Sequence, residues 1–526
     1  MRRIVCGFTL LAAAAFGQTA TPIRHLVVIF PENISFDHYF GTYPHAANPP
    51  GEPKFVGLPD TPVVNGLSAA LLTRNPNAAN PENGAGAVNP FRLDRSQAAT
   101  ADQDHSYGPE QMAFHVGLMD LFPKSVGKGN MPSGDASSPL NTTGLTMGYF
   151  DGNTVTALWN YAQHFSMSDN SFGSNFGPST PGAINLVSGQ TNGVVDIRNG
   201  HGGLADGGNG SYTLISDPDP VGDVCSATTR MLASMAGNNI GNLLDDANVT
   251  WGWFSGGFDL TAKNANGTAG CQRSSKSPVS GKVVRDYIPH HEPFQYYPST
   301  ANPTHARPGS VKSIGHGGDA ANHQYDTHDF FDAVKAGNFP AVSFLKAPAF
   351  EDGHAGYSNP LDEQRFIVQV VNFLQSRPEW KDTAVVIAYD DSDGWYDHQM
   401  GPIVNQSTGS QDALTGPGRC GNGASALPGV DAANAHAQGR CGFGPRLPMM
   451  AISPWARVNY VDHSLTNQAS VIVFIEDNWL KGRRLGKGSF DGISNSITGM
   501  FDFHGAPRMH KMLLDETTGE VKTAAK

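Results

Sequence analysis

Wholly apolar segments that end in acidic or amide side chains constrain the fold of this 526-residue chain most strongly. The clearest are residues 25–30 (HLVVIF) and residues 383–389 (TAVVIAY), and residues 341–345 (AVSFL) form a third. Strands that are apolar on both faces are typical of parallel sheets buried between helices. Apolar residues recur with helical spacing in four segments, which would supply the helices that cover the sheet: residues 154–165, 325–336, 361–377 and 466–479. The sequence therefore predicts an α/β fold with a mostly parallel central sheet and helices on both faces.

Stretches rich in glycine, proline and asparagine interrupt these elements. The chain contains 61 glycines and 36 prolines, which favours long surface loops. The main insertions lie near residues 41–103, 197–222 and 402–445. No linker or internal repeat separates the elements, so we expect one catalytic domain over residues 18–526.

The first residues have the layout of a secretory signal peptide. Two arginines precede an apolar run over residues 4–16, and Ala15-Phe16-Gly17 offers a small-x-small cleavage site. This run is too short to span a bilayer. We expect a signal peptide over residues 1–17, with cleavage as late as residue 20 as a second option, and a periplasmic or secreted protein. A buried first helix is the alternative, and no later segment reads as transmembrane.

Four cysteines remain after the signal peptide, which is consistent with an oxidising compartment. They allow three pairings. Because each pair would then enclose one loop-rich stretch, we favour two disulfides, Cys225–Cys271 and Cys420–Cys441. Free buried thiols are the alternative.

The formal net charge of −12 bears on the partners. An acidic surface argues against nucleic acid as a partner and against docking by charge on an anionic membrane. The sequence makes no prediction of the oligomeric state.

Polar side chains gather where the apolar strands end. Glu32 and Asn33 follow the first strand, and Asp390 and Asp391 follow the strand at 383–389. Ligands of open α/β sheets bind beyond the carboxyl ends of the strands. Carboxylate and amide oxygens there suit a hard or borderline divalent cation. Ordinary helix caps and turns are the alternative explanation.

A candidate nucleophile lies in the turn Gly177-Pro178-Ser179-Thr180-Pro181-Gly182, which leads into a helical stretch at 183–188. Backbone N–H groups at such a helix start face an incoming anion. A serine hydroxyl is a weak nucleophile until a base or a metal activates it, and an isolated serine here is more often a helix cap. Histidines in polar surroundings are candidates to contact phosphate: His105, His290, His291 and His354.

Four long stretches resemble a known family in sequence and in order. They are HLVVIFPENISFDHYFGTYP, DHSYGPEQMAFHVGLMDLF, FSMSDNSFGSNFGPSTPG and VVIAYDDSDGWYDH. They are similar to the bacterial phosphoesterase family of secreted acid phosphatases and phosphatidylcholine-type phospholipases C, a branch of the alkaline-phosphatase-like superfamily. The resemblance runs from about Arg24 to about Trp479.

The resemblance implies a role for each candidate residue. A divalent metal ion, of unspecified identity, would be bound by Glu32, Asn33, Ser179, Asp390 and Asp391. Ser179 would also be the nucleophile, and the four histidines named above would surround the phosphate. The implied activity is that of an exported metal-dependent phosphoesterase that works through a phosphoserine intermediate. Its substrate would be a small phosphate ester or a phospholipid head group.

Two departures from the family favour an acid-phosphatase-like enzyme over a phospholipase C, which stays the alternative. Gly182-Ala183 stands where many phospholipases C of the family have Asn-Arg, and the chain ends soon after its last predicted helix. A sulfatase is disfavoured because the sequence after Ser179 lacks a C/S-x-P-x-R pattern. A non-catalytic exported protein that binds phosphate or metal is the alternative from another class.

Overall fold

The computed structural model describes residues 19–130, 138–208, 210–407, 409–414, 420 and 437–522. The predicted signal peptide over residues 1–17 lies outside the described residues, as does part of the insertion at 402–445. Among the described residues, no helix has the length and apolar character needed to cross a bilayer. The prediction of one domain over residues 18–526 stays a prediction.

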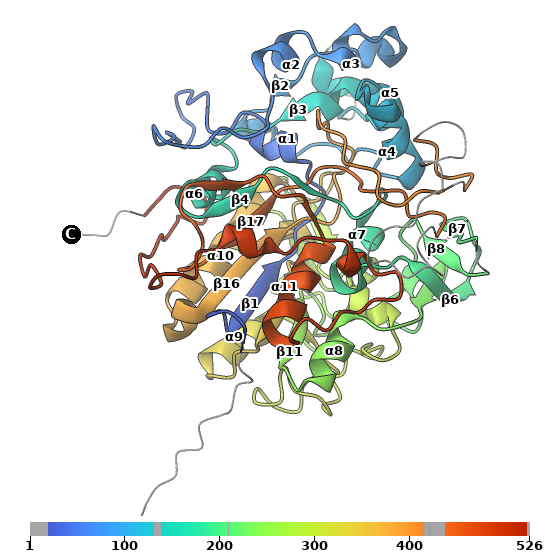
Figure 1. Ribbon diagram of the computed structural model, residues 1–526, viewed down its shortest axis with the longest axis vertical. Helices are drawn as coiled ribbons and strands as arrows, with labels where there is room; N and C mark the ends of the chain where they lie inside the picture. The colour runs from blue at the N-terminus through green and yellow to red at the C-terminus, as the bar shows by residue number, and fades with distance from the viewer. Residues whose placement is uncertain are drawn as a thin grey trace, which may run out of the picture.

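An eight-stranded sheet forms the centre of the molecule (Figure 1). Its strands, in spatial order, are β14 (Gln324–Asp326), β11 (Trp251–Ser255), β15 (Val342–Lys346), β1 (His25–Ile29), β16 (Thr383–Ala388), β17 (Met449–Ile452), β4 (Ser166–Ser168) and β18 (Tyr460–Asp462). Only β17 runs antiparallel to its two neighbours in this sheet. The other pairs are parallel, so the predicted mostly parallel sheet is confirmed.

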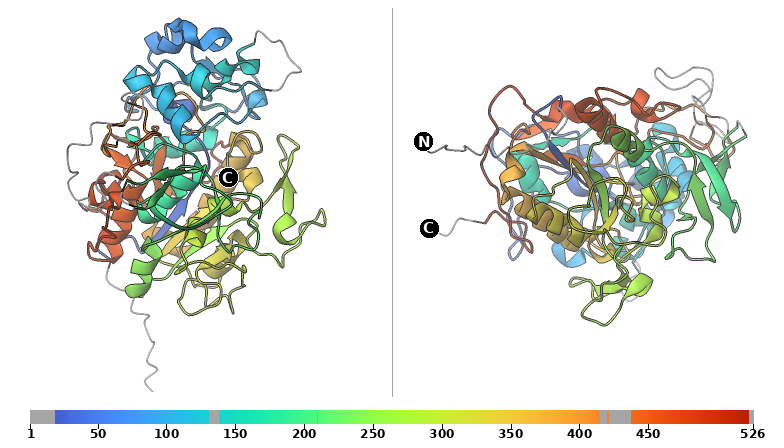
Figure 2. Two further views of the ribbon diagram at one scale, coloured as in Figure 1. Left: turned by 90° about the vertical axis from the view of Figure 1, so that its right-hand side faces the viewer. Right: turned by 90° about the horizontal axis from the view of Figure 1, so that it is seen from below.

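Helices cover both faces of this sheet because its strands are apolar on both sides. Val27 and Ile29 of β1 pack into one hydrophobic cluster, whereas Leu26 and Val28 pack into another. Helices α6 (Thr156–His164), α9 (Thr327–Lys335) and α10 (Pro360–Gln375) contribute to the first cluster. Helices α7 (Ser179–Ser188), α8 (Ile240–Asp246) and α11 (Ala469–Trp479) contribute to the second, and Figure 2 shows the layers from two further sides.

The first insertion contains more helix than its composition indicated. Short helices α2 (Ala69–Thr73) and α3 (Pro76–Ala79) interrupt residues 41–103. Together with α4 (Tyr107–Phe114) and α5 (Phe122–Ser125) they form the lobe at the top of Figure 1. Capping by asparagine explains part of this helical content, since the Asn75 side chain at the start of α3 accepts a hydrogen bond from the backbone N–H of Asn77.

The prediction of a loop at residues 197–222 was wrong in part. Three short strands lie within or across it: β7 (Leu204–Asp206), β8 (Tyr212–Leu214) and β9 (Asp219–Pro220). They join β6 (Asn192–Arg198) and β10 (Leu232–Met235) in a five-stranded sheet. The glycines serve the turns between strands: Gly208 and Gly210 adopt positive φ angles of 78° and 84°.

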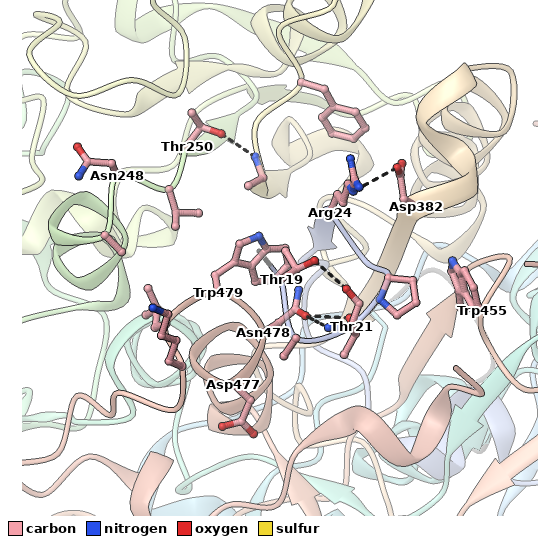
Figure 3. A pocket seen from close by; sticks show the side chains of 18 of the residues that line it. Thr19, Thr21, Arg24, Asn248, Thr250, Asp382, Trp455, Asp477, Asn478 and Trp479 are labelled. Carbon is pink, nitrogen blue, oxygen red and sulfur yellow. Dashed lines mark hydrogen bonds and ion pairs between the residues drawn. The ribbon is translucent and has the colours of Figure 1, made fainter. Parts of the chain in front are cut away.

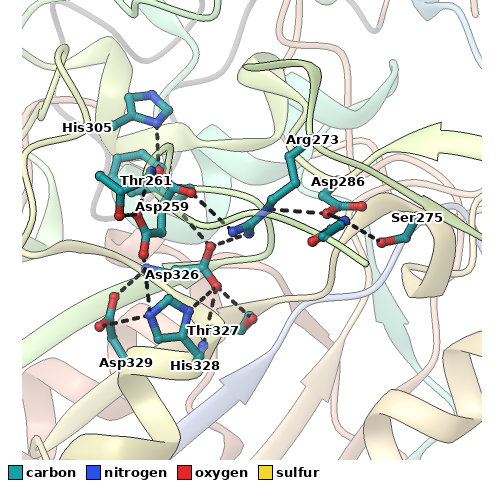
Figure 4. Close-up of polar contacts among 12 residues, drawn as sticks. Asp259, Thr261, Arg273, Ser275, Asp286, His305, Asp326, Thr327, His328 and Asp329 are labelled. Atoms are coloured by element: carbon teal, nitrogen blue, oxygen red, sulfur yellow. Dashed lines mark hydrogen bonds and ion pairs between the residues drawn. The ribbon is translucent and has the colours of Figure 1, made fainter. Parts of the chain in front are cut away.

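Both predicted disulfides, Cys225–Cys271 and Cys420–Cys441, are present in the structure. Near Cys271, a buried polar network connects the segment around Arg273 to the sheet (Figure 4). The guanidinium of Arg273 contacts the carboxylates of Asp286, at 3.3 Å, and of Asp326. Because Asp326 ends the edge strand β14 and also caps α9, this network fixes the segment around Arg273 against the edge of the sheet.

Candidate active site

The carboxyl ends of β1 and β16 bring two pairs of polar residues together. These strands are parallel neighbours, with Ile29 opposite Ile387, so the residues that follow them emerge at the same edge. The backbone N–H of Asn33 donates to Asp390 Oδ1 at 2.8 Å. Asn33 adopts a φ of 62°, a left-handed conformation that asparagine tolerates better than most residues. The predicted pairs Glu32–Asn33 and Asp390–Asp391 therefore lie side by side.

Ser179 reaches these carboxylates from a third segment. It is the first residue of α7, and its side chain is buried. Its hydroxyl Oγ lies 2.9 Å from Glu32 Oε2 and 3.3 Å from Asp391 Oδ2. The structure thus places the candidate nucleophile against the candidate ligands from both strand ends.

The backbone around Ser179 departs from expectation in one respect. The N–H of Thr180, which we expected to face an incoming anion, donates instead to Asp217 Oδ1 at 2.9 Å. Asp217 lies between β8 and β9 of the five-stranded sheet. A carboxylate from another segment therefore takes the place of a local cap, because Pro178 at the N-cap position has no side chain that could accept a hydrogen bond.

Three of the four predicted histidines border the carboxylates. His291 Nδ1 lies 3.2 Å from Glu32 Oε1, and His105 Nε2 lies 3.4 Å from the side-chain nitrogen of Asn33. His354 packs edge-on against His105, with 5.7 Å between ring centroids. His290 is directed elsewhere: its Nδ1 lies 3.3 Å from Asp219 of β9.

The pKa values of these histidines differ because their burial and their charged neighbours differ. Burial and the neighbouring histidines His290 and His354 hold the pKa of His291 well below its ordinary value. Burial, aided by His105, lowers the pKa of His354 to about 4. Burial alone would lower the pKa of His105, but the charges of Asp391 and Asp393 raise it well above its ordinary value.

The oxygen donors at this edge fit a divalent metal ion. Asn33 Oδ1 and Asp390 Oδ2 are buried and have no hydrogen-bond partner in the described part of the chain. Burial and the charge of Asp390 raise the pKa of Asp391 well above its ordinary value. A cation would give both free oxygens a partner and offset the repulsion between the carboxylates. Carboxylate, amide and hydroxyl oxygens are also the donors that a hard cation prefers.

Sequence reasoning missed a buried lysine in this site. The ammonium group of Lys346, at the end of β15, contacts Glu32 Oε1. Burial lowers the pKa of Lys346, while Asp390 and Asp352 oppose that shift. The signal was available, because Lys346 directly follows the apolar segment AVSFL, as Glu32 and Asp390 follow theirs within two residues.

A large pocket lies elsewhere in the fold. Its volume is about 1800 Å³, and Arg24, Asp382, Asn478 and Trp479 are among the residues around it (Figure 3). Arg24 immediately precedes β1, so this pocket opens at the amino edge of the sheet, opposite the Ser179 site. None of the predicted site residues lines it.

A parallel sheet with a buried serine and carboxylates at its carboxyl edge is one framework for phosphoester chemistry, and the comparisons agree with this. The Phosphoesterase family matches residues 23–480, so the chain belongs to that family.

Individual relatives are distant but match over most of this chain. The non-hemolytic phospholipase C of Pseudomonas aeruginosa is 24% identical over 87% of this chain and 54% of its own length. Phospholipase C B of Mycobacterium tuberculosis is 23% identical over 94% of this chain and 80% of its own length. The chain spans about half the length of the first of these relatives and of its Burkholderia pseudomallei counterpart.

Solved structures share the general fold only weakly. The murine ectonucleotide pyrophosphatase/phosphodiesterase 5 is 10% identical, with a TM-score of 0.30, over 66% of this chain and 95% of its own. A Vibrio parahaemolyticus protein of the alkaline phosphatase superfamily is 12% identical, with a TM-score of 0.27, over 82% of this chain and 81% of its own.

Proposed function

We propose that this chain is an exported, metal-dependent phosphoesterase that hydrolyses phosphate esters through a phosphoserine at Ser179. The observation that carries this proposal is the position of the Ser179 hydroxyl between Glu32 and Asp391, at 2.9 and 3.3 Å. A buried serine among carboxylates is otherwise an unfavourable arrangement, because like charges repel and desolvation penalises them.

The same five residues that the family resemblance implies would hold the metal: Glu32, Asn33, Ser179, Asp390 and Asp391. A bound divalent cation would lower the pKa of the serine hydroxyl and polarise a phosphoryl oxygen. Lys346 already offsets part of the negative charge on Glu32. A metal assay on the purified protein would identify the cation.

The reaction divides into two displacements at phosphorus. The Ser179 hydroxyl gives its proton to Glu32, to which it is hydrogen-bonded, and its oxygen attacks phosphorus in line. The phosphorus–oxygen bond to the alcohol breaks, and the alcohol leaves with a proton from His105, whose pKa is raised well above its ordinary value, while the neutral His291 and His354 lie beside the phosphate. Water then attacks the phosphoserine and gives a proton to His105, Glu32 returns its proton to the serine oxygen, and phosphate is released. With a diester substrate the released group is a phosphomonoester.

We propose acid-phosphatase-like specificity, with phosphomonoesters preferred over phosphatidylcholine. The support is local: Gly182 and Ala183 offer no guanidinium or amide beside Ser179 to contact a head group. The names of the relatives favour the second candidate, a phospholipase C that cleaves phosphatidylcholine-type lipids.

One set of assays separates these candidates. The purified protein and its Ser179→Ala variant are assayed with p-nitrophenyl phosphate, its phosphorylcholine diester and phosphatidylcholine vesicles, each with and without chelator. Fastest release from the monoester supports the phosphatase, and faster release of phosphorylcholine from lipid supports the phospholipase C. Binding of phosphate without turnover of any substrate would identify a non-catalytic binding protein.

Export is also proposed, to the periplasm or beyond the cell. The two disulfides support an oxidising compartment. The expected amino terminus of the exported protein lies between residues 18 and 21. Recovery of Met1 from the exported protein would contradict this proposal.

A further inference from the structure

A buried glutamate links the two segments that carry Ser179 and Asp391. Glu110 lies in α4 and is 1% exposed. Its Oε2 accepts a hydrogen bond from the backbone N–H of Gly177 at 2.9 Å. Its Oε1 accepts a hydrogen bond from the Ser392 hydroxyl at 2.8 Å. One carboxylate therefore connects the turn before Ser179 with the loop directly after Asp391.

Each of the two bonded groups has a defined local conformation. Gly177 has a φ of 117°, a backbone conformation that side-chain-bearing residues rarely adopt. The Ser392 oxygen accepts a hydrogen bond from the backbone N–H of Gly394 at 3.1 Å. The single proton of that hydroxyl is therefore available to Glu110. The two segments are far apart in sequence, so contacts between them, of which this is one, set their spacing.

The helix that carries Glu110 is itself fixed in place. The Tyr107 hydroxyl contacts Asp412, and the Gln111 side chain accepts a hydrogen bond from the backbone N–H of Ala413 at 3.0 Å. His105 lies two residues before the start of this helix. Because α4 is held in this way, Glu110 keeps a fixed position relative to His105.

Packing alone does not account for a carboxyl at this position. Burial raises the pKa of Glu110 to about 8, so ionisation is unfavourable here. An apolar side chain of similar size would fill the space without that cost. Glu110 makes no hydrogen bond to the Ser179 hydroxyl, whose partners are Glu32 and Asp391, so it has no direct route to act as its base.

We infer that Glu110 is a positioning residue that sets the distance between the Ser179 hydroxyl and the Asp391 carboxylate. This inference rests on the proposed function, in which Ser179 is the nucleophile and Asp391 a metal ligand. Glu110 acts through Gly177 and Ser392 and does not touch the substrate.

Three variants test the inference with p-nitrophenyl phosphate. Glu110→Leu removes both hydrogen bonds, and because a misplacement of about 1 Å can lower a rate about 100-fold, we expect kcat to fall by roughly that factor with KM changed less than threefold. Glu110→Gln can still accept from Gly177 and can donate to the Ser392 oxygen, so its kcat should stay within about tenfold of the parent. Ser392→Ala should lower kcat about tenfold, and combined with Glu110→Leu it should cause little further loss.

Glu476→Leu provides the matched control. Glu476 is also a buried carboxylate that accepts a backbone hydrogen bond, from Leu485 at 2.8 Å, but it lies in α11, next to Asp477 and Asn478, which line the pocket of Figure 3. Its loss should lower thermal stability and leave kcat unchanged. If Glu110→Leu behaves in the same way, with a lower melting temperature and an unchanged kcat, the inference is refuted.

The outcomes also separate this inference from the proposed function. Full turnover by Ser179→Ala would contradict the proposed nucleophile. An inactive Ser179→Ala together with an unchanged kcat in Ser392→Ala would contradict the positioning role alone. Ser392→Ala decides the matter even if Glu110→Leu does not fold, because it removes only one of the two hydrogen bonds to Glu110.

Discussion

Gly182 should be essential to the site because no side chain fits between α7 and the loop that carries Asp390. A Cβ atom at position 182 would lie 2.7 Å from the carbonyl carbon of Asp390 and 2.9 Å from its Cα. Contacts between carbon atoms are favourable near 3.5–4.0 Å, so α7 or the Asp390 loop would have to move by roughly 1 Å in Gly182→Ala. Neither neighbour can yield by a simple rotamer change, since both are backbone.

The expected magnitudes follow from two opposing effects. Alanine stabilises a helix interior relative to glycine by about 1 kcal/mol. Overpacking a buried site costs about 1–3 kcal/mol, so we expect a net loss of roughly 0–2 kcal/mol in the free energy of unfolding. The rate should suffer more, because a shift of about 1 Å between Ser179 and Asp391 can lower turnover about 100-fold.

The assay compares Gly182→Ala with Gly108→Ala. Gly108 lies in α4, and a Cβ there would meet nothing within 4 Å. Both variants are measured for kcat on p-nitrophenyl phosphate and for the midpoint of urea unfolding. The control should keep its kcat and gain up to about 1 kcal/mol. A Gly182→Ala variant with parental kcat would refute the argument that close backbone contact sets the geometry of the site.

Further expected outcomes concern the nucleophile, charge and stability. Ser179→Ala should lower turnover by several powers of ten, measured on an aryl phosphate, with the fold intact by circular dichroism. Asp217→Asn keeps an acceptor for the backbone N–H of Thr180 but removes a negative charge, whose repulsion of an anion 4 Å away in water is about 1 kcal/mol. The KM for an anionic substrate should therefore fall roughly fivefold. An unchanged KM would show that the charge of Asp217 does not act on the bound substrate. Burial, with Asp491, raises the pKa of Glu476 to about 9, so this carboxyl is protonated in the folded state and ionised in the unfolded state between about pH 4.5 and 9. Its contribution therefore becomes more unfavourable as pH rises through that range, and Glu476→Gln should raise the melting temperature more at pH 8 than at pH 5; an equal effect at both pH values would contradict the assignment. Cys225→Ser/Cys271→Ser should lose about 3–4 kcal/mol of stability in the chain-entropy model, and unchanged denaturant midpoints would count against it.

The strong elements of the fold could be predicted because their physical cause is local. β1 and β16 are buried on both faces, and no amphipathic alternative competes with a strand in segments such as HLVVI. The five-stranded sheet could not be predicted, because β7 and β8 have only three residues each. Strands this short show no recognisable alternation of apolar and polar residues, so pairing with distant segments determines whether they form.

The residues of the candidate site also fall into those that could be predicted from the sequence and those that could not. Glu32 and Asp390 could be proposed from their positions after apolar strands, since parallel strand ends share an edge. Asp217 and Glu110 could not, because their roles depend on hydrogen bonds to backbone groups far away in sequence. The histidine pair shows the limit most clearly: His291 faces Glu32, whereas its neighbour His290 faces Asp219.

The most direct measurement is the capture of the covalent intermediate. The protein is mixed with p-nitrophenyl phosphate, the reaction is quenched in acid within its first turnovers, and the digested protein is mapped by mass spectrometry. We expect one added phosphoryl group on the peptide that contains Ser179, present in the parent protein and absent in Ser179→Ala. A parent protein that turns over substrate while its phosphoryl group appears on a different residue, or on none in a rapid-quench series covering the pre-steady state, would contradict the assignment of Ser179 as the nucleophile.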